Sequence, residues 1–354
     1  MKIAVFLPNW MGDAVMATPT IHTMYHWFRP AELIGVMKPY VAGALEGNPW
    51  FKETLLVRDG TWSGSTWGTA KKLRERKVDL AVLFPNTFRT ALTAWLGKCK
   101  RRLGYNRHGR GFLLTETLES QRKQDGTFAP TPIIDDYNQI VERIGCPTPR
   151  YRMHLWTTAQ DEHRANLVWK ASGLNQKPEV ILLNPGGAFG AAKHWPTEHF
   201  AALAQKLVDQ RDCGVLVLCG PNEKRTAWEI VRQARRTDVH ALARFPLSLG
   251  LTKACVKRAT LLVTTDSGPR HFAGAFRRPV VTLFGPTHIE WTETYHPRAF
   301  HLQTQMSCGP CQQRTCPLKH RRCMTELTPD EVFAATTQLL KIVTRDQAPR
   351  PRSA

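Results

Sequence analysis

Two short apolar runs, separated by one short segment of mixed polarity, constrain the fold of this chain most. The runs LLVTT (261–265) and VVTLF (280–284) are β-branched and apolar and too short for helices, so we expect two buried strands. Asp266 or Ser267 suits the cap of a helix between them, and Pro269 suits its first turn. This order of elements predicts a βαβ unit with parallel strands.

The same alternation runs through both halves of the chain, which predicts an α/β protein with parallel, doubly wound sheets. A Pro-rich break at 145–150 separates the halves. The other expected strands lie at 2–8, 31–37, 54–57, 78–85, 101–105, 180–184 and 214–219. The expected helices lie at 14–27, 69–76, 87–96, 135–144, 159–172, 197–210, 222–235, 247–258 and 328–344. We expect Thr197 to cap the helix at 197–210.

These segments divide the 354 residues into two Rossmann-like domains. We assign residues 1–158 to the first domain and 173–327 to the second. Two such domains face each other across a cleft at the carboxyl ends of their strands. A helix at 328–345 follows, opened by Thr-Pro-Asp-Glu, and we expect the Pro- and Arg-rich tail at 346–354 to be disordered.

The charge of the chain favours acidic partners. It carries 49 Lys and Arg against 29 Asp and Glu, a net charge of +20. It has no zinc-finger or RNA-recognition signature, so we expect an anionic membrane surface or a phosphorylated substrate rather than nucleic acid. No run approaches the ~18–20 apolar residues of a membrane span. The first apolar run stops at Pro8, so we expect a first strand rather than a signal peptide, and a cytoplasmic protein.

Polar and small residues follow the expected strands, where parallel strands present their carboxyl ends. Asp13 follows the first strand, and its carboxylate there is either a helix cap or a general base that accepts a proton from an attacking hydroxyl. The loop with Gly186 and Gly187 lets a phosphate approach the backbone, and Lys193 offers it a positive charge. Glu223 either accepts hydrogen bonds from ribose hydroxyls or occupies the first turn of its helix.

The turn Asp266-Ser267-Gly268 begins the helix after LLVTT. A helix N-terminus at a sheet edge attracts anions, because its backbone N–H groups and its dipole both favour negative charge. Gly268 lets a ligand approach the backbone, and the helix also carries Arg270 and His271. The alternative is an ordinary βαβ unit with a well-made cap.

Four of the nine cysteines lie close together in the sequence. Cys308, Cys311, Cys316 and Cys323 are spaced x2, x4 and x6, and His320 lies among them. They suit a four-thiolate zinc or iron–sulfur site, although the gaps match no common zinc pattern and cytosolic thiols also cluster without metal. A metal here would be structural.

Five motifs occur in an order that resembles a known family. They are NWMGDAVMATP, NPGGAFGAAKHWP, TTDSGPRHFAGA, LFGPT and CGPCQQRTCP. Each is modest alone, but together they resemble the ADP-heptose:lipopolysaccharide heptosyltransferases of glycosyltransferase family 9, and the cysteine segment resembles the heptosyltransferase II branch. The motifs span nearly the whole chain.

The resemblance implies a GT-B fold, with the C-terminal helix packing back on the N-terminal domain, and an inverting transfer of heptose from ADP-heptose to the lipopolysaccharide inner core. Asp13 would be the general base, and Lys193 would stabilise the leaving ADP. The Asp266 turn with His271, the loop of Gly186 and Gly187, and Glu223 would bind the donor. The resemblance implies no metal or other cofactor for catalysis, and an acceptor of lipid A and inner core at the inner membrane.

Two departures from the family pattern leave the donor open. The residues after Thr287 are HIEW rather than the usual continuation, and the loop at 188–192 lacks the hydroxyls that often hold phosphate. Two alternatives therefore stand beside the heptosyltransferase: a GT-B enzyme that uses another nucleotide-sugar, and a non-catalytic binder of anionic lipid or nucleic acid.

Overall fold

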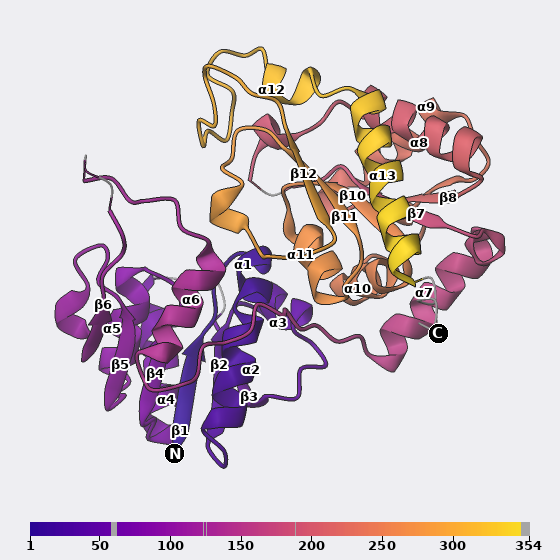
Figure 1. Cartoon of the computed structure of the whole chain (residues 1–354). Helices are drawn as coiled ribbons and strands as arrows, with labels where there is room; N and C mark the ends of the chain where they lie inside the picture. Colours follow the sequence, from indigo (N-terminus) through magenta and orange to yellow (C-terminus); the bar gives the residue numbers. More distant parts are fainter. Residues whose placement is uncertain (58–61, 123, 125, 188, 348–354) are drawn as a thin grey trace, which may run out of the picture. The chain divides into compact units, whose positions relative to one another are not determined.

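The computed structural model describes residues 1–57, 62–122, 124, 126–187 and 189–347, and the chain forms two compact units (Figure 1). The first comprises Met1–Trp156 with Glu290–Tyr295; the second comprises Thr157–Ile289 and the chain from His296 onward. Each unit holds one six-stranded parallel sheet flanked by helices, so the α/β class is confirmed.

The sheet of the first unit has the order β3-β2-β1-β4-β5-β6. Its strands are β1 (Lys2–Phe6), β2 (Glu32–Met37), β3 (Phe51–Leu56), β4 (Leu80–Leu83), β5 (Arg101–Tyr105) and β6 (Glu116–Leu118). Its helices are α1 (Met11–Met16), α2 (Thr18–Trp27), α3 (Pro39–Ala44), α4 (Trp62–Arg76), α5 (Phe88–Leu96) and α6 (Ile133–Glu142). The chain leaves β1 in one direction for β2 and β3, then returns to β4 on the other side, as in a Rossmann fold.

The sheet of the second unit repeats this topology, with the order β12-β11-β10-β7-β8-β9. Its strands are β7 (Val180–Asn184), β8 (Gly214–Val217), β9 (Val239–Ala241), β10 (Leu261–Thr265), β11 (Val280–Phe284) and β12 (Ala299–Gln303). Its helices are α7 (Ala159–Ala171), α8 (Thr197–Arg211), α9 (Lys224–Ala234), α10 (Leu249–Arg258), α11 (Gly268–Ala275), α12 (Arg322–Thr325) and α13 (Pro329–Gln347). The central strands β7, β8, β10 and β11 are buried along their whole length, as apolar β-branched runs require.

Several local expectations differ from the structure. The helix expected at 14–27 is two helices, α1 and α2, and Pro196 rather than Thr197 precedes the first turn of α8. The strands β6, β9 and β12 were not expected. They lie at or near the sheet edges, and their short, mixed sequences carry no continuous apolar run.

The units are divided differently from the domains expected from the sequence. The second unit begins at Thr157 and includes α7, which packs on α10. Glu162 of α7 accepts hydrogen bonds from Lys257 and Arg258 of α10, so charge as well as packing attaches this helix to the second unit.

The expectation that the C-terminal helix packs back on the N-terminal domain is corrected. Figure 1 shows α13 beside α8, over the second sheet. The helix α13 contacts α8 and the strands β10, β11 and β12 of its own unit. The reason is its apolar stripe, which is buried in the core of the second unit: Val332, Ala335, Leu339 and Leu340. The helix runs to Gln347, past the start of the tail expected at 346, and residues 348–354 lie outside the described residues.

Within the described ranges, none of the helices combines the length and apolar character needed to cross a lipid bilayer.

Candidate functional site

Four neighbouring strands of the second unit end at one edge of its sheet. Because β11, β10, β7 and β8 are adjacent and parallel, the turns that follow them lie together. Asn184 at the end of β7 ties two of these turns to each other. Its Nδ2 donates to the Thr264 hydroxyl at 3.0 Å and to the Ser267 hydroxyl at 2.9 Å. The Thr265 hydroxyl donates to the Gly186 carbonyl at 2.7 Å.

Lys193 lies at the centre of this edge and is buried. Its Nζ donates to Asp266 twice, to carboxylate Oδ2 at 2.5 Å and to the backbone carbonyl at 3.2 Å. The ring of Phe189 lies 4.4 Å from the same ammonium, which adds a cation–π contact. The glycine-rich loop and the start of α11 are therefore joined by one buried ion pair.

Asp266 is a charge partner, and of the two residues that we expected to cap α11, Asp266 and Ser267, it is not the one at the N-cap position. Ser267 occupies the N-cap position of α11, and neither side chain caps the helix. The Asp266 carboxylate also accepts from the Thr287 hydroxyl at 2.9 Å and lies 3.7 Å from Arg270. Burial alone would raise the pKa of Asp266, but Lys193 and Arg270 more than offset burial and leave this pKa below its usual value.

The first turn of α11 presents Gly268 and Pro269 to this edge. Pro269 has no N–H, and that of Arg270 donates to the Ser267 carbonyl at 3.1 Å, so this helix end offers an anion the N–H of Gly268 and the helix dipole. Lys193, Arg270 and Asp266 together leave one net positive charge beside it. His271 is buried on the same helix. Burial, and secondarily Arg270, lower its pKa to about 3, so its imidazole stays neutral and adds no positive charge.

Glu223 holds two turns together through its carboxylate. Oε1 accepts from the backbone N–H of Gly187 at 3.1 Å, and Oε2 accepts from the N–H of Gly220 at 2.7 Å. A Cβ on Gly186 would overlap this carboxylate, whereas one on Gly187 would make only ordinary contacts. Gly186 is thus required for the close approach of Glu223. Ala188 of this loop lies outside the described residues.

A hollow of about 230 Å³ opens beside Glu223. It is lined by Pro185 and Gly186 after β7, by Glu223 and Thr226 at the start of α9, and by Arg321. Residues 194–198, which lead into α8, complete the lining. Its size suits part of a ligand bound along this edge.

Asp13 belongs to the first unit and lies in the first turn of α1. Trp10 takes the N-cap position, so Asp13 is not the cap of this helix. It is half-buried, and its charge reaches Tyr137 of α6. Burial first, and the Asp13 charge second, raise the pKa of that phenol well above its usual value. Asp13 thus places a carboxylate in the first helical turn after β1.

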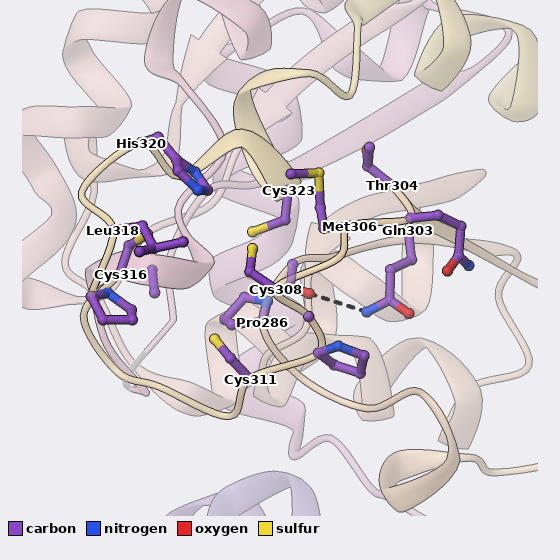
Figure 2. A pocket seen from close by; sticks show the side chains of 16 residues that line it. Pro286, Gln303, Thr304, Met306, Cys308, Cys311, Cys316, Leu318, His320 and Cys323 are labelled. Atoms are coloured by element: carbon purple, nitrogen blue, oxygen red, sulfur yellow. Dashed lines mark hydrogen bonds between the residues drawn. The ribbon is translucent and has the colours of Figure 1, made fainter.

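The four clustered cysteines line one small hollow of about 40 Å³ together with His320 (Figure 2). Burial raises the pKa of the Cys323 thiol, and the three other thiols raise it further. The pKa of the Cys316 thiol is lowered instead, because backbone N–H groups of residues 318–321 are directed at its sulfur. As placed, no three His, Cys, Asp or Glu side chains in the described part of the chain are close enough to hold a metal ion.

The structure therefore brings most of the expected donor-binding residues to one edge of the second unit: Gly186, Gly187, Lys193, Glu223, Asp266, Ser267 and Gly268. Two contributors were missed from the sequence. Asn184 and Thr287 are ordinary polar residues in the NPGG and LFGPT motifs. The available signal was that Asn184 ends one buried strand and that Thr287 lies in the turn three residues after another.

Relatives of known name extend along nearly the whole chain. The lipooligosaccharide heptosyltransferase 2 of Campylobacter jejuni is 26% identical over 351 residues, 96% of this chain and 99% of the relative. The lipopolysaccharide heptosyltransferase 2 of Escherichia coli K12 is 26% identical over 348 residues, with the same coverage. The solved structure of E. coli ADP-heptose LPS heptosyltransferase II superposes with a TM-score of 0.79 at 22% identity. It covers 97% of this chain and 100% of that chain, so the fold is shared.

A family model described as glycosyltransferase family 9 (heptosyltransferase) matches residues 66–321, which is most of the chain, and we conclude that this protein is a glycosyltransferase that belongs to this family.

Proposed function

We propose that this enzyme transfers heptose from ADP-heptose to the inner core of lipopolysaccharide, with inversion at the anomeric carbon. The observation that carries the proposal is the buried Lys193–Asp266 pair at the N-terminus of α11, on the carboxyl edge of the second sheet. The names of the relatives from C. jejuni and E. coli support the acceptor class. The E. coli ADP-heptose LPS heptosyltransferase II, whose fold this chain shares, supports the donor by its name.

The donor diphosphate binds at this edge in the proposed mechanism. As the glycosidic bond to the diphosphate breaks, negative charge grows on the leaving ADP. The N–H of Gly268 and the dipole of α11, with Lys193 and Arg270, stabilise that charge, and Asp266 keeps both cations fixed in place. This arrangement supplies the stabilisation that a divalent metal would otherwise give, so we propose that catalysis needs no metal or other cofactor.

Asp13 is the general base of the proposed reaction. It accepts the proton of an acceptor hydroxyl while that oxygen forms its bond to the anomeric carbon from the face opposite the diphosphate. The protonated Asp13 and free ADP are the products on the protein side. Support comes from the position of Asp13 at the carboxyl end of β1, in the half-buried first turn of α1 and not at its cap.

The acceptor is part of a membrane lipid, so we propose that the protein works at the anionic inner membrane surface of the cytoplasm. Its net charge of +20 supports this location, because basic side chains near an anionic surface contribute about 1 kcal/mol each.

Two variants test the proposal against the alternatives. Asp13→Asn should abolish heptose transfer while ADP binding stays unchanged, and Lys193→Met should weaken ADP binding by about tenfold or more, the loss of one charge-assisted contact. Lys170→Met, at an exposed position of α7, is the control. Full transfer by Asp13→Asn would remove this residue from the mechanism.

Protection from unfolding by added nucleotide-sugars tests the identity of the donor. Equal protection by ADP-heptose, UDP-sugars and GDP-sugars would reject ADP-heptose as the donor. A wild-type protein that is inactive with every donor would favour a non-catalytic binder.

A further inference from the structure

The four-cysteine segment occupies a stretch that has no secondary structure of its own. Residues 304–321 connect β12 to α12 without a helix or strand, and only Cys323 lies in an element. Such a segment buries little apolar surface, so a cross-link is the usual way to fix it. The cysteines are free thiols in the structure.

The hollow between these thiols has the size of a single small ligand. Its volume of about 40 Å³ exceeds the roughly 10–15 Å³ that a cavity needs to hold one water molecule. Figure 2 shows the sulfurs of Cys308 and Cys323 facing one another, with Cys311 and Cys316 on the surrounding loop. His320 reaches the same hollow and adds a fifth side chain suited to a borderline-soft cation.

The chain around Cys316 turns back on itself tightly. The N–H of Lys319 donates to the Cys316 carbonyl at 3.1 Å, and Lys319 and Arg321 adopt positive φ values of 59° and 49°. This turn brings Cys316 and His320 to the lining of the same hollow.

We propose that Cys308, Cys311, Cys316 and Cys323 bind one Zn²⁺ as a structural site. The sulfurs as placed are too far apart for coordination. A change of χ1 rotamer moves a cysteine sulfur to another staggered position without moving the backbone, and we infer that metal binding draws the four sulfurs together in this way. Four thiolates and no open position are typical of structural zinc.

The proposed zinc site is attached directly to the glycine-rich loop. Arg314, between Cys311 and Cys316, accepts a hydrogen bond at its carbonyl from the N–H of Ala192 at 3.1 Å. A Cβ on Gly190 would collide with the same carbonyl, and Ala192 itself lines the cysteine hollow. Zinc would therefore position the turn that carries Lys193. The effect of zinc on the Lys193 turn matters for function only if the proposed donor site is correct, whereas zinc binding itself does not depend on that proposal.

Metal analysis of the full-length protein tests the site. Purified without chelator, it should retain one zinc per chain, and Cys308→Ser, Cys311→Ser, Cys316→Ser and Cys323→Ser should each lower zinc affinity by at least about tenfold, since even outer-shell changes cost about 10–100-fold. Cys146→Ser, a buried cysteine of the first unit, should retain zinc in full. Retention of iron in place of zinc would overturn the choice of metal.

Cobalt substitution gives a readout that is independent of catalysis. Co²⁺ added to the chelator-treated protein should produce the thiolate-to-metal charge-transfer band of a four-sulfur site, and Cys316→Ser should weaken it. A folded protein that retains no metal and shows no such band would reject the proposal. If zinc is present but its removal leaves ADP affinity unchanged, the link to the Lys193 turn is rejected and the metal site stands.

Discussion

Lys193 lies at the carboxyl edge of the second sheet as one half of a buried ion pair. This pairing limits the positive charge that Lys193 alone contributes to the site. Its ammonium is already neutralised by Asp266, with both side chains less than a tenth exposed. The net positive charge of the site therefore depends on Arg270 and on the backbone of α11 as much as on Lys193. A buried pair of this kind is costly to break, because the remaining charge is left uncompensated.

His271 should make the stability of the second unit depend on pH. Its folded pKa is about 3 and its unfolded pKa is about 6.5. Between these values only the unfolded chain binds the proton, so stability should fall as pH is lowered from 6.5, by about 1.4 kcal/mol per pH unit. Other charged groups acting on this imidazole are Arg270, Asp266, Lys193 and His301.

Urea unfolding at several pH values between 4 and 7 measures this slope. His271→Gln should flatten it, whereas His163→Gln, at an exposed position of α7, should leave it unchanged. An identical slope in wild type and His271→Gln would contradict the assignment of a neutral, buried His271.

At the scale of elements, Glu223 connects the turns after β7 and β8 by accepting one backbone hydrogen bond from each. Glu223→Gln would place an amide N–H₂ against one of two backbone N–H donors, from Gly187 and Gly220, and leave that donor unsatisfied. We expect the affinities for ADP and for pyrophosphate to fall together, each by at least about tenfold, because the whole loop is released. Titration calorimetry with both ligands measures this. A loss for ADP alone would instead support a direct contact between Glu223 and the ribose.

The helix α13 should stabilise the second unit through its buried stripe. Leu339 is 1% exposed and belongs to the core under the second sheet. Leu339→Ala should lower the free energy of unfolding by about 2–5 kcal/mol, the usual cost of such a cavity. Ile342→Ala, on the same helix but 40% exposed, is the matched control and should cost much less. Equal effects of the two changes would place α13 outside the core.

The elements that could be predicted from the sequence are those with a continuous apolar run or a strong cap. β7 and β10 match the expected strands residue by residue, because every side chain in them is buried. The strand β12 has mixed exposure, and its sequence AFHLQ gives no clear period. For the site, the glycines and charged residues that follow the strands correctly indicated the carboxyl edge of the second sheet. The pairing of Lys193 with Asp266 was not predictable, because these residues are 73 positions apart in the sequence and only the sheet brings them together.

At the scale of the whole molecule, part of the excess of positive charge gathers around a hollow of the first unit. This hollow, of about 520 Å³, is lined by Arg150 and Arg152 and by the imidazoles of His22, His26 and His154. No Asp or Glu is among its lining residues, so its field is positive. An anionic phosphate group is the chemistry that such a surface attracts.

Vesicle binding should report this charge. The full-length protein should bind vesicles that contain anionic lipid and should release them as salt rises toward 1 M, where the screening length falls to about 3 Å. Arg150→Gln with Arg152→Gln should weaken binding more than Lys71→Gln with Lys72→Gln, which removes the same charge from the exposed face of α4. Equal losses would mean that net charge acts without a preferred surface. Binding to neutral vesicles that persists at high salt would contradict electrostatic association and point to apolar contacts with the bilayer.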